Sequence, residues 1–100
     1  MQLTLKIIGE DKIFVAPFIS GLMLRHALQL MKSNKINDLD AETLDELVQF
    51  VVDLYGGQFT VDELYAGVES TELVPVISNS ISGVINKTNK ATEPLQDPNA

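Results

Sequence analysis

The first fifteen residues are the part of the sequence that most constrains the fold. Leu3, Leu5 and Ile7 alternate with polar residues, which is the period of a β-strand with one buried face. A second apolar run at residues 13–15 follows a turn signal at residues 9–11, so the two segments predict a β-hairpin. Because an isolated hairpin is only marginally stable in water, the rest of the chain must supply a surface that covers it.

The remaining periodicity is helical and falls into four segments. Each segment begins at a residue whose side chain can cap the first turn of a helix. These residues are Ser20, Asp40, Thr60 and Ser70 or Thr71. Gly56-Gly57 and Gly67 mark the ends of the second and third segments. We therefore predict an α+β fold, mostly α, in which an N-terminal β-hairpin is followed by about four helices.

The composition changes after Asn86. Residues 87–100 contain lysine, threonine, asparagine and two prolines, but almost no side chain that a core could bury. We therefore predict a single domain over residues 1–86 and a disordered C-terminal tail over residues 87–100. The total length of 100 residues fits one small hydrophobic core.

The charged residues are divided by sign along the sequence. Every charged side chain between residues 12 and 35 is basic, and every one between residues 38 and 72 is acidic. Oppositely charged helices could therefore pair within one molecule or between subunits, and the sequence leaves both interpretations open. The formal net charge of −7 disfavours nucleic acid as a partner, because the chain would repel the phosphate backbone.

Targeting signals and membrane spans are not found in the sequence. The first residues lack a basic segment followed by a long apolar stretch, so they do not predict a signal peptide. No apolar run approaches the ~20 residues that a membrane span needs. The chain contains no cysteine, which is compatible with the cytosol and leaves no disulfide or thiolate chemistry.

Motifs for catalysis or metal binding are also missing from the sequence. His26 is the single histidine, so a zinc site built from several histidines is excluded. A calcium loop counted from Asp38 fails, because Thr43 replaces the required glycine and Gln49 replaces the bidentate glutamate. Neither a phosphate-binding loop nor a nucleophile elbow occurs. We therefore predict no catalytic residue, no metal, no cofactor and no enzymatic activity.

Bulky and flexible side chains supply the candidate binding surface. The helix predicted over residues 20–33 is apolar over most of its circumference, which is typical of a helix covered on two sides. The hairpin could cover one side, and a neighbouring helix or another subunit the other. Methionine and aromatic side chains are favoured where helices dock on partners. The candidate partner-binding residues are Phe18, Leu22, Met23, His26, Leu30 and Phe50.

Three strings and their order resemble a known family, the tail assembly chaperones of siphophages that infect Gram-positive bacteria. The strings are FVAPFISG at residues 14–21, LDELVQFVV at residues 44–52 and YGGQFTVDELYAG at residues 55–67. They contain helix caps and apolar helix faces rather than catalytic motifs. The resemblance covers about residues 1–86.

The resemblance implies a non-enzymatic role in virion morphogenesis. Such chaperones bind the long, helical tape measure protein in the host cytoplasm and keep it soluble until tail-tube subunits polymerise around it. They associate with themselves and are absent from the mature virion. Their genes often contain a programmed ribosomal frameshift, and this chain resembles the short product. The alternatives are a small acidic adaptor or regulatory protein of a phage or bacterium, and a structural tail component.

Overall fold

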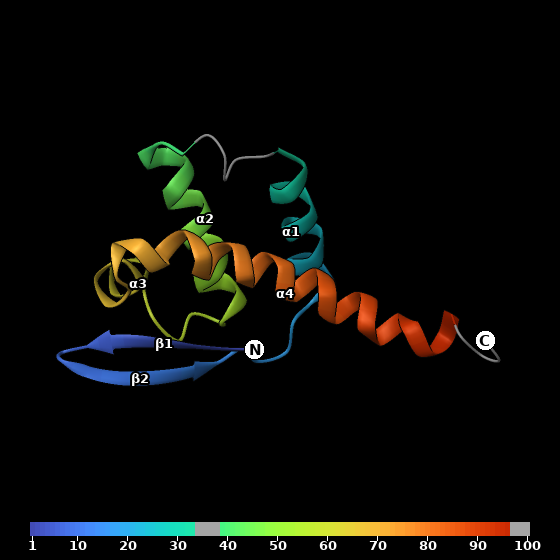
Figure 1. Cartoon of the computed structure of the whole chain (residues 1–100), viewed down its shortest axis with the longest axis horizontal. Coiled ribbons are helices and arrows are strands. Elements are labelled where there is room, and N and C mark those ends of the chain that lie inside the picture. The colour runs from blue at the N-terminus through green and yellow to red at the C-terminus, as the bar shows by residue number, and fades with distance from the viewer. Residues whose placement is uncertain (34–38, 97–100) are drawn as a thin grey trace.

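The computed structural model describes the backbone of residues 1–33 and 39–96 and the side chains of residues 1–33 and 39–86. In this part of the chain a β-hairpin is followed by four helices, which confirms the predicted α+β fold (Figure 1). The elements are β1 (Gln2–Ile7), β2 (Glu10–Val15), α1 (Gly21–Ser33), α2 (Ala41–Leu54), α3 (Val61–Gly67) and α4 (Ser70–Gln96).

The two strands are antiparallel, and Leu3 lies opposite Phe14. The turn that joins them is Ile8-Gly9, whose φ angles are 53° and 77°. Positive φ at both central residues is typical of a two-residue type I′ turn. The sequence pattern placed the turn at residues 9–11, which is slightly too late. The reason is that a β-branched residue such as Ile8 rarely adopts positive φ, so it gives no turn signal.

Hydrogen bonds from backbone N–H groups to side chains confirm two of the predicted helix starts. At the start of α2, the carboxylate of Asp40 accepts a hydrogen bond from the N–H of Thr43 at 2.7 Å. At the start of α3, the hydroxyl oxygen of Thr60 accepts from the N–H of Glu63 at 3.0 Å. The carboxylate of Glu63 accepts in return from the N–H of Thr60 at 2.9 Å, which completes a capping box.

The glycine pair after α2 ends that helix as the sequence predicts. Gly56 and Gly57 have φ angles of 71° and 72°, which a side chain would make unfavourable. The N–H of Gly57 donates to the carbonyl of Val52, and that of Gly56 donates to the carbonyl of Asp53, each at 3.0 Å. These two bonds form a Schellman motif, which satisfies carbonyls that the helix end would otherwise leave unpaired.

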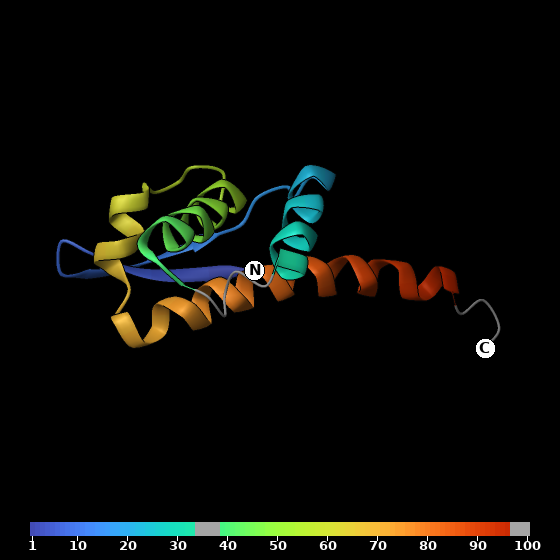
Figure 2. The same ribbon diagram turned by 90° about the horizontal axis from the view of Figure 1, so that it is seen from above.

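One hydrophobic core joins the hairpin to the helices. Figure 1 shows the helices on one side of the hairpin, and Figure 2 gives the same arrangement from above. α3 packs on β1, while α2 contacts α1, α3 and α4. The ring of Phe59 lies 5.0 Å from that of Phe14 and 5.6 Å from that of Tyr55, so it links β2 to the end of α2. The largest fully buried core side chains are Leu5, Leu47, Val48, Phe50, Val51, Leu54, Tyr55, Leu64, Ile77, Ile81 and Val84.

α4 is longer than the sequence predicts. The helix extends to Gln96, whereas the composition placed the end of the domain at Asn86. Once a helix has formed, each added residue gains a backbone hydrogen bond, so a loss of apolar side chains does not itself end it. Residues 97–100 of the predicted tail lie outside the described residues.

Candidate protein-binding grooves on helix α1

Helix α1 has one covered side and one open side. Its buried residues are Ala27 and Leu30. The helix packs mainly on α4, with a smaller contact to α2. The sequence suggested the hairpin as a cover for one side of this helix, but the main cover is α4. Leu22, Leu28 and Met31 are 70%, 48% and 53% exposed, respectively. The open side of α1 therefore presents large apolar side chains to solvent.

A groove lies between α1 and α2, and we call it the α1–α2 groove. Its volume is about 360 Å³. Helical spacing places its α1 residues on one face of that helix, and α2 contributes Asp53. The imidazole of His26 packs edge-on against the ring of Phe50, with ring centroids 5.2 Å apart, so this part of the groove rests on the core. The lining residues are Leu22, Met23, Arg25, His26, Gln29 and Asp53.

Three of the six predicted partner-binding residues meet in this groove. They are Leu22, Met23 and His26. Phe18 lies three residues before α1 and is 88% exposed, so it is accessible as well.

The other two predicted residues, Leu30 and Phe50, lie in the hydrophobic core and do not line the groove. Leu30 is 2% exposed and Phe50 is fully buried, so both belong to the core and neither can contact a partner in this fold. Helical periodicity identifies an apolar face, but it does not show which of two apolar faces turns inward.

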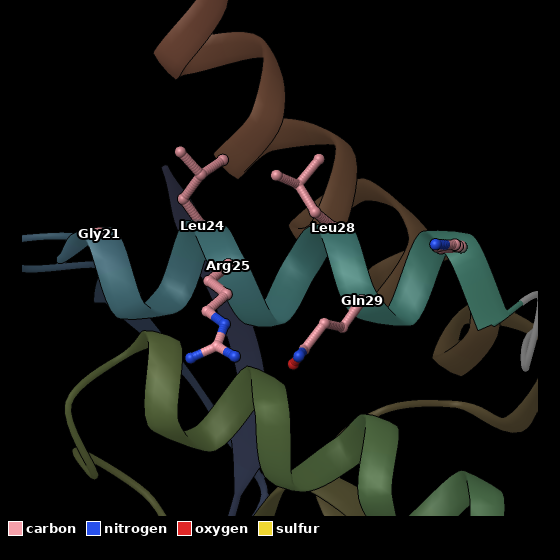
Figure 3. Close-up of a pocket in the computed structure, with 6 residues that line it drawn as sticks. Gly21, Leu24, Arg25, Leu28 and Gln29 are labelled. Carbon is pink, nitrogen blue, oxygen red and sulfur yellow. The ribbon is translucent and has the colours of Figure 1, made fainter.

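A second groove lies on the neighbouring face of the same helix, and we call it the outer α1 groove. Its volume is about 320 Å³. Leu24 and Leu28 point to one side of it, and Arg25 and Gln29 point to the other side, toward α2 (Figure 3). Gly21 and Lys32 complete the lining. Nothing in the sequence separates Leu24 and Leu28 from the core, although two basic residues at helical spacing run beside them.

The exposed face of α2 is acidic. Gln49 lies on this face, and its side-chain amide donates to the carboxylate of Asp53 at 2.8 Å. The acidic residues on the face are Glu42, Asp45, Glu46 and Asp53. Since Arg25 and Lys32 of α1 are exposed as well, the two helices present opposite charges side by side.

A short hydrogen bond joins α3 to the acidic face of α2. The hydroxyl of Tyr65 donates to a carboxylate oxygen of Asp45 at 2.5 Å. Burial of the phenol, together with this hydrogen bond and the negative charge of Asp45, raises the pKa of Tyr65 to about 12 from its ordinary value of 10.0. The neutral phenol is therefore the form that the folded chain stabilises.

This pKa shift predicts a loss of stability in strong alkali. The pKa of Tyr65 is raised in the folded state, so its contribution is complete below pH 10 and disappears as the pH rises from 10 to 12. We expect the tyrosinate absorbance of Tyr65 in the native protein to develop near pH 12 rather than near pH 10. In the Asp45→Asn variant, one tyrosine should ionise at lower pH, because the carboxylate is gone.

The second tyrosine needs a control. Burial also raises the pKa of Tyr55, so both tyrosines should ionise above pH 10. The Tyr65→Phe variant removes one of the two signals and assigns the other. A signal that appears at pH 10 in the native wild type and is lost in Tyr65→Phe would contradict the arrangement around Asp45.

The remaining polar groups of the described chain are dispersed or satisfied. The described residues include no group of three His, Cys, Asp or Glu side chains that could hold a metal ion. None of the described helices is both long enough and apolar enough to span a bilayer. Ser80 is a buried polar residue, and its hydroxyl donates to the carbonyl of Val76 at 2.8 Å. The surface features that distinguish this part of the chain are therefore the two α1 grooves and the acidic face of α2.

A small α+β domain with an exposed apolar helix and grooves edged by charged residues has the features of a protein-binding domain. A family model described as phage tail chaperone protein matches residues 1–99. The chain therefore belongs to the phage tail chaperone protein family, which confirms the resemblance found in the sequence. No match was found among curated proteins or among solved structures.

Proposed function

We propose that this chain is a non-enzymatic chaperone that binds the tape measure protein during phage tail assembly. It keeps this client soluble in the host cytoplasm, helps to recruit tail-tube subunits, associates with further copies of itself and is absent from the mature virion. Membership of the phage tail chaperone family supports the general role. The observation that supports client binding is the open, apolar side of α1 beside the α1–α2 groove.

The chemistry of the α1–α2 groove suits an amphipathic helix of the client. Leu22 and Met23 offer apolar surface, and methionine adapts its shape to different partners. Arg25 and Asp53 supply both signs of charge at the edges. An amphipathic helix lays its apolar face into such a groove and places its polar residues at the rim. This mode of binding fits a long helical client that presents many similar segments.

Phe18 lies in the segment that joins β2 to α1 and is a second candidate for client binding. Its side chain is 88% exposed, so most of its apolar area contacts water in the free chain. Covering an aromatic side chain of this kind contributes roughly 1.5–3 kcal/mol to binding. Aromatic anchors next to a groove are frequent hot spots of protein interfaces. Phe18 and Leu22 are therefore the residues that we expect to contribute most to client binding.

The test is co-expression of the full chain with the tape measure protein, followed by size-exclusion chromatography with mass determination. We expect wild type to keep the client in the soluble fraction, in complexes that contain many copies of this chain. The Leu22→Glu variant should leave the client insoluble, because a charged group would face the client's apolar side. Its circular dichroism should match wild type, since Leu22 is 70% exposed.

The matched control is Ile13→Glu. Ile13 is 64% exposed, opposite Thr4 on the outer face of the hairpin, so the same chemical change occurs away from the groove. This variant should keep the client soluble. Equal loss of the client with both variants would show that general surface apolarity, rather than the groove, is what matters.

Two outcomes would favour the alternative functions. If wild type leaves the client insoluble and elutes as a compact monomer, the chain is better explained as a small acidic adaptor. If mass spectrometry detects the chain in purified virions, it is a structural tail component. Either result would overturn the chaperone proposal.

A further inference from the structure

The turn of the hairpin contains a residue that the fold itself does not explain. Ile8 is 96% exposed, the highest value among the large apolar side chains described. Its φ of 53° lies in the left-handed region, which β-branched residues strongly avoid. Glycine or asparagine would suit the turn better, and isoleucine contributes nothing to the core from this position. Strain combined with exposure of this kind points to a role outside the fold.

The outer α1 groove offers a complementary surface. Leu24 and Leu28 give it an apolar side, and Arg25 and Lys32 give it positive charge. Both of these basic side chains are exposed. Both views place the hairpin turn and α1 on opposite sides of the folded body (Figures 1 and 2). One molecule therefore cannot bring its own turn to its own groove.

The charges at the two places are also complementary. Figure 1 shows α3 and the start of α4 near the hairpin turn, at the left of the view. The hairpin contributes both signs of charge, through the basic Lys6 and Lys12 and the acidic Glu10 and Asp11, and the two pairs balance. α3, the start of α4 and the residues between them add only acids, which are Asp62, Glu63, Glu69 and Glu72. The turn therefore lies at an acidic end of the molecule, whereas the charged residues of α1 are basic.

We propose that Ile8 of one copy inserts into the outer α1 groove of the next copy, between Leu24 and Leu28. The acidic end around the turn then faces Arg25 and Lys32. This inference rests on the self-association that is part of the proposed function, and it assigns the interface. The contact is heterologous, since each copy uses its turn on one side and its groove on the other. Repetition of such a contact produces an open array or a ring, and an open array places many α1–α2 grooves along one long client.

A second copy explains the observations better than the client does. The client would account for an apolar groove, but it would not account for a strained and exposed isoleucine at the other end of the same chain. The exposed face of α2 is acidic too, but it has no large apolar side chain among the described residues to fill the groove. The experiment must therefore distinguish a second copy from the client as the occupant of the outer α1 groove.

The experiment measures self-association of the full chain by sedimentation velocity over a range of concentrations. Wild type should form larger species as its concentration rises, and added salt should weaken them, because exposed charges are screened. The Ile8→Gly and Leu28→Glu variants should each weaken association by roughly tenfold or more, as expected for loss of a central contact. The melting temperature of Ile8→Gly should rise, because glycine adopts positive φ without strain. Loss of association in a more stable protein excludes misfolding as the cause.

Mixing the two variants tests the heterologous geometry. The Leu28→Glu copy retains Ile8, and the Ile8→Gly copy retains the groove, so the mixture should form a one-to-one dimer and no longer species. Wild-type association of both variants, or no dimer in the mixture, would overturn the proposal. Loss of client binding with normal self-association in Leu28→Glu would overturn it as well and would assign this groove to the client.

The same variants separate this inference from the proposed function. A wild-type chain that keeps the client soluble but stays monomeric at all concentrations would refute the interface and leave client binding intact. A wild-type chain that associates as predicted, with a mixture that gives the dimer, but leaves the client insoluble would refute the chaperone function and leave the interface intact.

Discussion

Replacing Phe50 by alanine should lower the free energy of unfolding by about 3–5 kcal/mol, the usual cost of removing a buried aromatic ring. Phe50 is fully buried in α2 and packs against the ring of His26 in α1. Its loss would leave a cavity where the two helices meet. Because small domains are stable by only about 5–15 kcal/mol, this one substitution should remove a large part of the total. The measurement is the midpoint of urea unfolding, monitored by circular dichroism.

Phe18→Ala is the matched control for this prediction. The chemical change is identical, but Phe18 is 88% exposed, so its unfolding free energy should stay within about 0.5 kcal/mol of wild type. Client binding should be weakened in Phe18→Ala, although the free energy of unfolding of this variant is unchanged. Similar unfolding midpoints for the two variants would contradict the assignment of Phe50 to the core.

Gly67→Ala should also destabilise the fold, by about 1–3 kcal/mol, which is typical of overpacking. A Cβ atom at Gly67 would lie 3.1 Å from the carbonyl oxygen and 3.3 Å from the nitrogen of Lys6, and 3.2 Å from the Cβ of Leu5. These atoms belong to or adjoin the backbone of β1, which cannot move without disturbing its pairing with β2. The close approach of α3 to β1 therefore depends on glycine at this position.

Gly83→Ala provides the comparison. Its Cβ would come closer to the terminal methyl of Met1 than a Cβ at Gly67 would come to any atom. That methyl ends a flexible side chain, which can turn away at little cost. Alanine also favours the helix interior over glycine by up to about 1 kcal/mol. We expect the melting temperature to fall in Gly67→Ala and to stay level or rise in Gly83→Ala. A fall of equal size in both would show that the nearest distance matters more than the mobility of the atom concerned.

The sequence was sufficient for those features that depend on a few neighbouring residues. The capping box at Thr60 and Glu63 and the helix end at Gly56-Gly57 are both present as predicted. Each motif satisfies backbone groups within one turn of the chain, so its residues determine the local geometry with little help from the rest. The order of strands and helices follows from these helix caps and helix-ending glycines, and the fold class follows from that order.

Features that depend on distant contacts were harder to predict. Leu22 and Leu30 lie on one apolar helix, yet the first is exposed and the second is buried, because α4 covers only one side of α1. Isoleucine rarely adopts positive φ, so the sequence did not identify Ile8 as a turn residue. The fold nevertheless imposes positive φ at this position. The outer α1 groove was missed for the same reason, since an apolar stripe on a helix does not show whether another helix covers it.

The packing of α3 against β1 has a consequence for the order of events during synthesis. β1 leaves the ribosome before the helices of this domain, but the close contact of Leu5 and Lys6 with Gly67 can form only after about sixty further residues have been made. A hairpin alone is marginal, and contacts this distant in sequence form late in folding. Until its third and fourth helices emerge, the newly made chaperone therefore exposes the apolar side of its own first strand.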